Sequence, residues 1–499
     1  MAIKTKNSFA LKFFVSAICG IVGSLALFST VSFKPTKSMI DRLSSVFFEA
    51  GPLAISLGAL AVTCLVLLLV IKRKWQDPVV IVEAIILSVL TICGRSFDDL
   101  GSPAFFCGDA IQFLICVICL VGYFVLYVVA IGLLYWCLNS IRRFPRPEFE
   151  NVSLRFIIIC VAIIAIFWLP ICIICWPGGA TYDYIVQLSM FNGSNTLTNH
   201  HPVMMTFLFG SLYGFGCFLG SASYGVAITV CLQLISLLCV AACNIWYLLR
   251  LHVPRVVTIV TVLYYALCPI FPLYGVVLVK DVFSAAFMGL FLLQVASLLV
   301  EQRGDGVKIG TWLRLFIIAM LCSLSRNNCV YIVAPTLLAL VYFVRKEYAK
   351  QSLSVALSVV SLYCIWTMAL MPALGIHSGN IREALSLPTQ QTAYYLAQYG
   401  ESDLSDNERS SLNAVIDCDF QELASLYNYK LSDPVRHHFT FKSRDDLARY
   451  LMAWFSMGIR HPELYACAFS RGTFGYWYPF VGSDELFRGF GSLCDKGLA

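Results

Sequence analysis

The sequence predicts an all-α protein that crosses a membrane about eleven times and ends in a mainly α-helical, extracytoplasmic region. The first observation is composition: 59% of the 499 residues are hydrophobic and 13% are charged, whereas soluble domains have about 25% charged residues. The second is a series of long apolar stretches, and the third is a concentration of charge near the C-terminus. Together they exclude a soluble enzyme, a nucleic-acid-binding protein and a disordered chain.

The apolar stretches are close to the length of membrane-spanning helices, which need about 20 apolar residues. The first follows Lys4, Lys6 and Lys12 and lacks a small-residue cleavage site, so we expect an uncleaved anchor. A further stretch, 203–219, is rich in glycine and is expected to lie in the outer interface of the membrane instead of crossing it. The predicted spans are 13–31, 52–71, 78–94, 110–138, 156–175, 224–249, 256–278, 282–300, 312–325, 329–344 and 353–371.

Basic residues predict the orientation, because lysine and arginine gather in cytoplasmic loops. Alternate loops are rich in bases, among them Lys72–Lys74, Arg142, Arg143, Arg146, Arg155, Arg250, Arg255, Arg303, Lys308, Arg314, Arg345, Lys346 and Lys350. We therefore expect a multi-pass protein of the cell membrane with a cytoplasmic N-terminus. The chain from about 372 is then extracytoplasmic, provided that 203–219 does not span.

The charges divide the chain into a membrane part and a tail. Residues 1–371 carry 24 bases and 14 acids, whereas 372–499 carry 11 bases and 15 acids. We expect residues 372–499, the tail, to form an extracytoplasmic region after the transmembrane part over 1–371. Most of the 21 cysteines lie in apolar runs and are expected to act as small hydrophobic residues, while a disulfide among Cys418, Cys467 and Cys494 stays open.

The most informative polar residue is Asp183, which follows the helix-breaking sequence Pro177-Gly178-Gly179 after the fifth span. A lone carboxylate between Tyr182 and Tyr184 is partly desolvated, which is expected to raise its pKa and suits a general base. The alternative, which local sequence favours, is that Asp183 caps a short helix beginning at Tyr184.

Three more polar groups stand at outer helix ends. Asn199-His200-His201-Pro202 precedes the stretch 203–219, Lys280-Asp281 starts the eighth span, and Ser325-Arg326-Asn327-Asn328 lies between the ninth and tenth. Lys280, Arg326 and one histidine are suited to bind a phosphate. The alternatives are solvated histidines and cations that anchor the protein to ordinary phospholipid. Three separated outer loops that together carry a carboxylate, a histidine pair and two cations favour a shared site more strongly than any one of these loops does alone.

These motifs resemble the GT-C superfamily of membrane glycosyltransferases, and more closely an uncharacterised family of bacterial polytopic membrane proteins usually grouped with it. The similarity covers roughly 150–480, which implies an added N-terminal module of four transmembrane helices over 1–150, a GT-C-like transmembrane core over 151–371 and the extracytoplasmic tail over 372–499. The motifs that carry it are Tyr182-Asp183-Tyr184…Gln187, Asn199–Pro202, Lys280-Asp281, Ser325–Asn328, Leu387–Ala393, Ser432–Val435 and Tyr476–Pro479.

The resemblance implies a GT-C-like fold and inverting transfer of a sugar from a polyprenyl-phosphate donor to a glycan or lipid acceptor of the cell envelope. Asp183 would deprotonate the acceptor hydroxyl, and Lys280, Arg326 and His200 or His201 would bind the departing phosphate. The expected substrate-binding residues are Tyr182, Gln187, Asn199, Asn327, Gln390 and Gln391, although packing explains the two tail glutamines better. Some GT-C enzymes hold a divalent metal with paired acids; Asp183 has no acidic neighbour, so no metal ligand is assigned and metal dependence stays open.

Two other classes of function remain: a transporter or flippase of lipid-linked sugars, and a non-catalytic protein of envelope assembly. A transporter is expected to place polar residues at mid-membrane and to show internal repeats. The predicted spans are nearly free of charge, with Glu83 as the clearest exception, and we expect Glu83 to make an ordinary polar contact within or between helices.

Overall fold

The structure is a computed structural model, and it describes residues 2–30, 38–72, 77–141, 153–251, 253, 255–302, 307–379 and 381–480. The chain forms two compact units, one of residues 1–143 with 381–489 and the other of 144–380 with 490–499. The expected division into three successive segments stays a prediction. Of the residues used above, Arg73, Lys74, Arg142, Arg143, Arg146, Arg303 and Cys494 lie outside the described residues.

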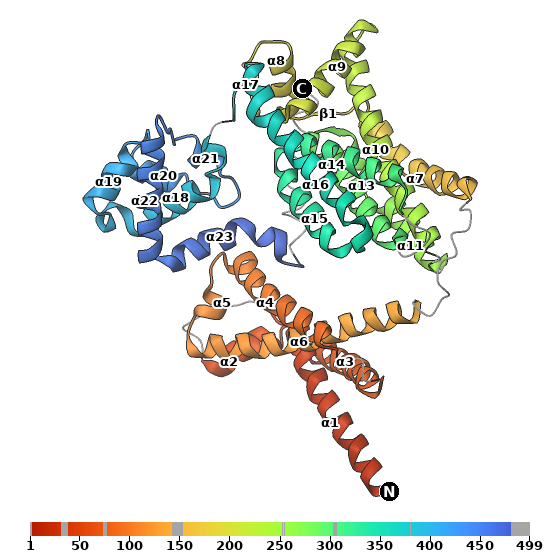
Figure 1. Ribbon diagram of the computed structural model, residues 1–499. Helices are drawn as coiled ribbons and strands as arrows, with labels where there is room; N and C mark the ends of the chain where they lie inside the picture. The colour runs from red at the N-terminus through yellow and green to blue at the C-terminus, as the bar shows by residue number, and fades with distance from the viewer. Residues whose placement is uncertain are drawn as a thin grey trace. The chain divides into compact units, whose positions relative to one another are not determined.

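The N-terminal part of the first unit is built of helices α1 to α6 (Figure 1). Small residues let some of these helices pack closely. A Cβ atom on Gly20 would lie 1.9 Å from Thr63 Oγ1, and one on Gly122 would lie 2.4 Å from the Cβ of Ala26. Small residues of this kind let membrane helices approach closely. The helices are α1 (Ala2–Leu27), α2 (Met39–Phe47), α3 (Pro52–Lys72), α4 (Pro78–Leu100), α5 (Ala104–Cys107) and α6 (Ala110–Ile141).

Glu83 makes the polar contact that the sequence suggested. The hydroxyl of Tyr135 on α6 donates to Glu83 Oε1 on α4 at 3.0 Å. The acid therefore has an interhelical partner, and it needs no role in transport to explain its place in a membrane helix.

The tail contributes the rest of the first unit and is also helical. The spacings Ser405…Glu408 and Ser443…Asp446 in the sequence predict two helix starts, and the structure confirms both, since each serine forms a capping box with the acid three residues later. Its α-helices are α18 (Ser386–Tyr399), α19 (Asp406–Asn413), α20 (Phe420–Ser425), α21 (Asp433–Arg436), α22 (Arg444–Arg460) and α23 (Pro462–Trp477), with 3₁₀ turns η4 (Ile381–Glu383) and η5 (Gly400–Asp403).

The sequence pattern predicts that Leu447, Tyr450, Leu451, Trp454 and Phe455 share one apolar face of α22, but the buried face is narrower. Tyr450, Ala453 and Met457 are buried, but Phe455, which we expected on that face, is 62% exposed. Its position is one residue beyond Trp454, and at 100° per residue it turns away from the tail core. The last helix, α23, packs against α4, and Phe474 joins Phe97 in one apolar cluster.

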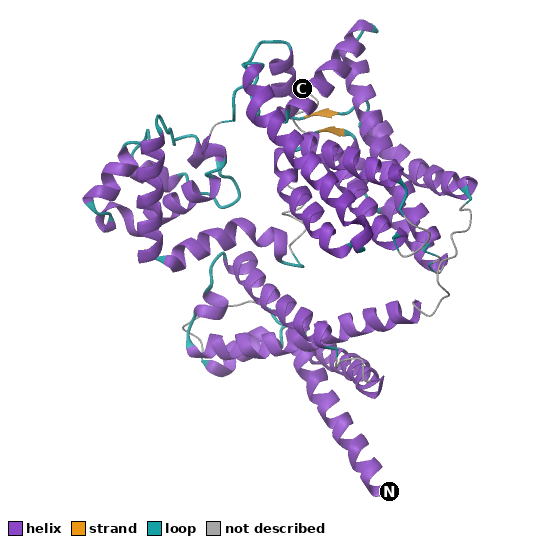
Figure 2. Ribbon diagram, viewed as in Figure 1, coloured by secondary structure: helices purple, strands orange, loops and turns teal. Residues whose placement is uncertain are grey.

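The second unit is a helical bundle with one small sheet, whose two strands are visible in Figure 2. Strand β1 (Gly179–Ala180) pairs in parallel with β2 (Val277–Leu278). The first helices are α7 (Leu154–Ile174), α8 (Tyr182–Phe191), α9 (Val203–Phe218), α10 (Ala222–Arg250), α11 (Arg255–Leu267) and α12 (Ile270–Gly275). They are followed by α13 (Lys280–Glu301), α14 (Ile309–Ser325), η1 (Asn327–Cys329), α15 (Val330–Phe343), η2 (Lys346–Tyr348), α16 (Ala349–Ile365), the π-helical segment η3 (Trp366–Leu370) and α17 (Met371–Ala373).

The expectation of one continuous span over 256–278 is wrong. Helix α11 ends at Leu267, a short α12 follows, and the chain then enters β2. Pro269 and Pro272 supply no backbone N–H to a continuing helix, which explains the break. The buried amide of Gln233 on α10 donates to the carbonyls of Gly275 and Val277, at 3.1 and 2.8 Å, and holds this segment in place.

Eight helical segments of the described residues are long and apolar enough to cross a membrane, as expected for a multi-pass membrane protein. They are α1, α3, α4, α6, α7, α10, α13 and the segment Lys346–Ala373. Helices α9, α11, α14 and α15 are apolar but shorter. The count of eleven spans, the interfacial position of 203–219 and the orientation of the chain stay predictions.

Candidate functional site

The small sheet brings two helix starts together. Strand β1 leads into α8 and strand β2 leads into α13, so their parallel pairing places the first turns of these helices side by side. Thr181 joins them, since its hydroxyl donates to the carbonyl of Leu278 at 2.7 Å and accepts from the backbone N–H of Tyr184 at 3.2 Å. Thr181, not Asp183, is therefore the N-cap of α8.

The side chain of Asp183 does not cap α8 and instead contacts Lys280. Lys280 is the first residue of α13, and its Nζ donates to Asp183 Oδ2 at 2.5 Å. His201 lies against the pair, with its Nδ1 3.4 Å from Lys280 Nζ and 3.8 Å from Asp183 Oδ2. The side chains of His201 and Lys280 are 4% and 14% exposed, while that of Asp183 is 41% exposed. The carboxylate thus remains open to a ligand, while its two partners are largely buried.

The expected rise in the pKa of Asp183 is wrong. Burial does raise it, but the hydrogen bond and positive charge of Lys280 lower it more, and the net pKa lies below the usual value. Burial and the charge of Lys280 lower the pKa of His201 to about 4. At neutral pH the cluster therefore holds an ionised Asp183 and an uncharged His201, which supplies no positive charge to a phosphate.

A second ion pair stands at the neighbouring helix ends. Arg326, between α14 and η1, places its guanidinium 2.8 Å from Asp281 Oδ1, and both side chains are partly exposed. The amide of Asn327 donates to the backbone carbonyl of Asn199 at 2.8 Å, which ties this turn to the loop that carries the histidines. Direct contacts therefore join four of the polar segments: Asp183 with Lys280, His201 with Lys280, and Asn199 with Asn327.

The other predicted site residues of this unit have different surroundings. Tyr182 is 81% exposed, and His200 is exposed with its ring 4.6 Å from that of His201, centroid to centroid. Gln187 is fully buried on α8, and its amide donates to the carbonyl of Asp183 at 3.2 Å. Gln187 therefore supports the backbone of the first turn from inside and is not exposed to a ligand.

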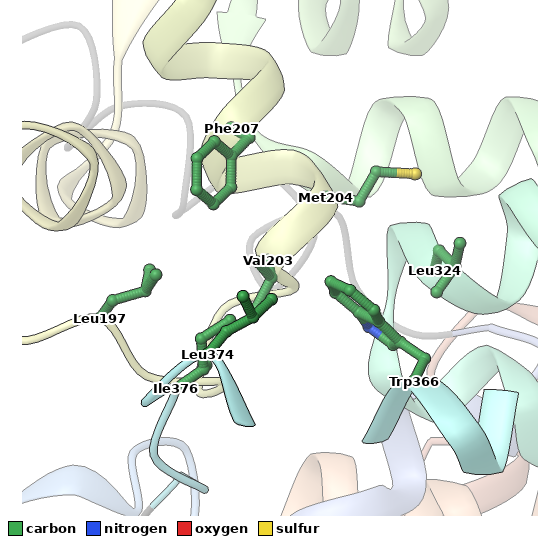
Figure 3. A pocket seen from close by; sticks show the side chains of 8 residues that line it. All are labelled: Leu197, Val203, Met204, Phe207, Leu324, Trp366, Leu374 and Ile376. Atoms are coloured by element: carbon green, nitrogen blue, oxygen red, sulfur yellow. The ribbon is translucent and has the colours of Figure 1, made fainter. Parts of the chain in front are cut away.

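An apolar pocket of about 490 Å³ adjoins these polar groups. Val203 of its wall follows His201 by two residues, and Leu324 precedes Arg326 by two residues, so two of the polar segments lead into its wall. Figure 3 shows its side chains around one space, with Val203, Met204 and Phe207 from α9, Trp366 from η3, and Leu197, Leu324, Leu374 and Ile376.

Gln390 and Gln391 belong to the tail and make structural hydrogen bonds there. The Gln390 amide donates to the carbonyls of Asn428 and Leu431, at 3.1 and 3.0 Å. Gln391 donates to the carbonyl of Tyr465 and accepts from the indole N–H of Trp454, both at 3.1 Å. These contacts account for both residues by packing, which was the favoured alternative.

The donor set around Asp183 does not fit a divalent metal. Asp183 faces an ammonium group, and Asp281, the nearest acid in sequence to Lys280, faces a guanidinium. A bound cation would have to displace both, so we assign no metal here. Among the described residues, one group has the spacing of metal ligands, Asp417, Cys418 and His438 in the tail, where His438 Nδ1 lies 2.7 Å from Asp417 Oδ1.

Residues 192–485 match DUF6020, a family of unknown function. The chain belongs to this family. The matched range of the DUF6020 chain includes His200, His201, Lys280 and Arg326, and it begins after Asp183. No curated protein and no solved structure matches it. The family match names no activity, and the resemblance to GT-C enzymes stays a prediction.

Three residues that position the candidate site were not singled out from sequence. They are Thr181, which caps α8 and bonds Leu278; Gln233, which fixes β2; and Trp366, which walls the apolar pocket. A sequence signal existed for the first, because a threonine directly before a helical pattern is a common N-cap. The other two depend on contacts between distant segments.

Proposed function

We propose that this protein is a membrane glycosyltransferase that moves a sugar from a polyprenyl-phosphate donor to a hydroxyl of a cell-envelope acceptor at the outer face of the membrane. The observation that carries the proposal is the Asp183–Lys280 pair, an ionised and partly exposed carboxylate held by a cation beside an apolar pocket. Such a donor needs a site with both a charged and an apolar part.

The chemistry assigned to Asp183 is proton removal. As the acceptor hydroxyl oxygen attacks the anomeric carbon, its proton passes to the carboxylate, a new C–O bond forms, and the bond from that carbon to the phosphate oxygen breaks. The electron pair leaves with the polyprenyl phosphate. Attack opposite the leaving group inverts the anomeric configuration. The low pKa of Asp183 keeps it deprotonated and ready to accept a proton at neutral pH.

Lys280 connects the base to the leaving group. In the structure its ammonium group is paired with Asp183, and this pairing makes the carboxylate a weaker base. A donor phosphate next to Lys280 would share this charge, so the pKa of Asp183 would rise at the moment when its basicity is needed. Arg326, at the adjoining helix end and half exposed, supplies a second cation for the developing negative charge.

The apolar pocket is assigned to the first part of the prenyl chain. Its walls are entirely apolar side chains, and its volume of about 490 Å³ is that of a small-ligand site. The rest of a long prenyl chain would extend into the bilayer, which costs nothing in desolvation. Trp366→Ala would enlarge this pocket and weaken donor binding without touching the ionic groups.

The experiment is complementation of a deletion strain with wild type and Asp183→Asn, read by the glycan composition of the cell envelope. The proposal predicts that deletion removes one sugar from the envelope and that Asp183→Asn, inserted at normal abundance, fails to restore it. Full restoration by Asp183→Asn, or accumulation of an intact lipid-linked unit on the cytoplasmic side, would contradict transfer at this site.

The matched control is Asp445→Asn. Asp445 occupies the second position of α22, after the capping Ser443, as Asp183 occupies the second position of α8 after the capping Thr181. It is exposed and remote in sequence from the site residues, so its substitution repeats the local change without touching the ionic cluster. We expect it to restore the envelope glycan.

A further inference from the structure

The tail contains a pocket that the proposed transfer reaction does not use. It has a volume of about 540 Å³ and is lined by residues of α18, the segment after α20, the start of α21 and α23. We call it the Arg471 pocket, and its walls include Tyr394, Gln398, Tyr427, Asn428, Tyr429 and Arg471. Unlike the pocket beside α9, it combines aromatic, amide and charged side chains.

Arg471 is held by aromatic rings. Its guanidinium carbon lies 5.0 Å from the ring centroid of Tyr429, 5.5 Å from that of Tyr394 and 5.7 Å from that of Tyr427. Cation–π contacts fix a guanidinium without neutralising it. Within the part of the chain that the structure describes, no carboxylate forms an ion pair with Arg471. The acid beside the pocket, Asp433, is paired with Arg436 at 2.6 Å.

Hydrogen-bonding capacity is also unused here. Arg471 Nε and the Tyr427 hydroxyl are buried without a hydrogen-bond partner among the described residues. Burial raises the pKa of Tyr427 to about 12, so its hydroxyl remains neutral at physiological pH. Lys430 also lies at this wall, with its Nζ 5.4 Å from the ring centroid of Tyr429.

We propose that the Arg471 pocket binds an acidic sugar unit of a glycan. The guanidinium edge pairs with the carboxylate or phosphate of the ligand, as planar arginine does with such groups. A sugar ring has an apolar face and hydroxyl groups. The tyrosine rings can pack against that face, and the amides of Gln398 and Asn428 can form hydrogen bonds with the hydroxyl groups. This inference concerns the tail alone and does not depend on transfer at Asp183.

The test is binding of trigalacturonate to the full-length protein in detergent micelles, measured by calorimetry beside neutral maltotriose and triglutamate. We expect trigalacturonate to bind more tightly than either other probe. Arg471→Gln should weaken it by about ten-fold or more, the loss of one charge-assisted hydrogen bond. Equal binding of maltotriose would remove the role of charge, and equal binding of triglutamate would favour an acidic peptide; either result overturns the proposal.

Two further variants keep the test independent of folding. Gln398 is exposed at the rim, so Gln398→Trp obstructs the pocket and leaves the Arg471 side chain in place; it should also weaken trigalacturonate. Arg449→Gln removes an exposed arginine of α22 that pairs with Asp446 and should leave binding unchanged. Unchanged binding in Gln398→Trp, or equal loss in Arg449→Gln, would contradict the assignment.

Discussion

Among single residues, Lys280 decides the electrostatics of the site. It is largely buried, yet it reaches the one carboxylate that the sequence singled out, and it also lies 3.4 Å from His201. Removing it would leave Asp183 partly desolvated with no cation in contact. The burial that now opposes the lowered pKa would then dominate.

Lys280→Met is therefore expected to move the pH dependence of activity. The wild-type carboxylate, with its pKa held low, stays ionised in mild acid, so activity should persist until the pH falls through that low pKa. In Lys280→Met the pKa of Asp183 rises, because burial is no longer outweighed by the cation, and the acidic limb of the profile should shift to higher pH. The measurement is sugar transfer in reconstituted vesicles between pH 4 and 8.

Lys442→Met is the control, because Lys442 is an exposed lysine of the tail, remote in sequence from the site residues. Its profile should match that of wild type. If Lys280→Met lowers the rate equally at every pH, Lys280 does not act on the ionisation of Asp183.

The sequence located these residues but not their pairing. The helix starts at Asp183 and Lys280 follow from nearby breakers and capping patterns, which are local. The contact between them depends on the β1–β2 pair, which joins segments almost a hundred residues apart. Asp183 was expected to be a lone acid with a raised pKa because nothing local shows which cation approaches it.

At the scale of elements, α9 and α10 form a close-packed hairpin. A Cβ atom on Gly216 would lie 1.9 Å from the backbone nitrogen of Gly225, so the two helices touch at their backbones. Gly220, with φ +114°, makes the turn between them. Helix α9 begins at Val203, two residues after His201. The hairpin therefore supports the loop that carries the two histidines.

Gly216→Val should separate the helices, since the nearest atoms are backbone and cannot rotate away. We expect a loss of about 2 kcal/mol in stability, as for overpacked cores, and a lower thermal midpoint of the detergent-solubilised protein. Gly214→Val is the matched control, because a Cβ atom there meets nothing within 4 Å. Equal destabilisation by both would show that the loss comes from helix flexibility and not from the α9–α10 contact.

The tail has its own ionic core around Arg460. Its guanidinium bonds Glu408 at 2.6 and 2.8 Å and Asp403 at 3.1 Å, and Glu408 is only 4% exposed. Burial raises the pKa of Glu408, but the hydrogen bonds it accepts, chiefly from Arg460, lower that pKa by more than burial raises it. The pKa of Glu408 is therefore below its usual value. The two capping boxes were predictable because they are local, whereas this network joins α19, η5 and α22 and was not.

Arg460→Met should cost the tail about 2 kcal/mol, because it leaves the buried Glu408 unpaired while solvent screens part of the loss. In the wild type, a depressed carboxyl pKa gives stability that is present at neutral pH and is lost as the pH falls below about 4. This acid dependence should weaken in the variant. Limited proteolysis of the tail from pH 3 to 7 measures both effects.

Arg449→Met serves as the comparison, since it removes an exposed arginine of the same helix. It should change neither the rate of proteolysis nor its pH dependence. If Arg460→Met behaves in the same way, the network does not stabilise the tail.

For the whole molecule, the packing of α23 on α4 bears on the orientation. Phe474 and Phe97 share a cluster at the C-terminal end of α4, so the tail and that end of the helix lie on one side of any membrane that α4 crosses. The basic loops predict that this is the outer side. The composition thus predicted a multi-pass protein. The break in the helix within 256–278 was not predicted, because Pro269 and Pro272 stand in a long apolar stretch that has the length of a membrane span.

Labelling of native lysines in intact cells tests this orientation. A membrane-impermeant amine reagent should modify Lys430 and Lys442 of the tail. The exposed Lys346, in η2, and Lys350, in the first turn of α16, should react only after permeabilisation. Mass mapping of the peptides gives the answer. Labelling of Lys346 but not of Lys442 in intact cells would invert the topology and place the Asp183 site in the cytoplasm.

The central claim is that Asp183 and Lys280 form the centre of a sugar transfer from a lipid phosphate. The most direct measurement is the fate of the lipid-linked donor that a deletion strain accumulates, extracted and incubated in vesicles with purified wild type or Asp183→Asn. The account predicts that wild type consumes the donor and releases free polyprenyl phosphate, while Asp183→Asn leaves it intact. Equal release by both proteins, or an intact donor that only changes leaflet, would contradict it.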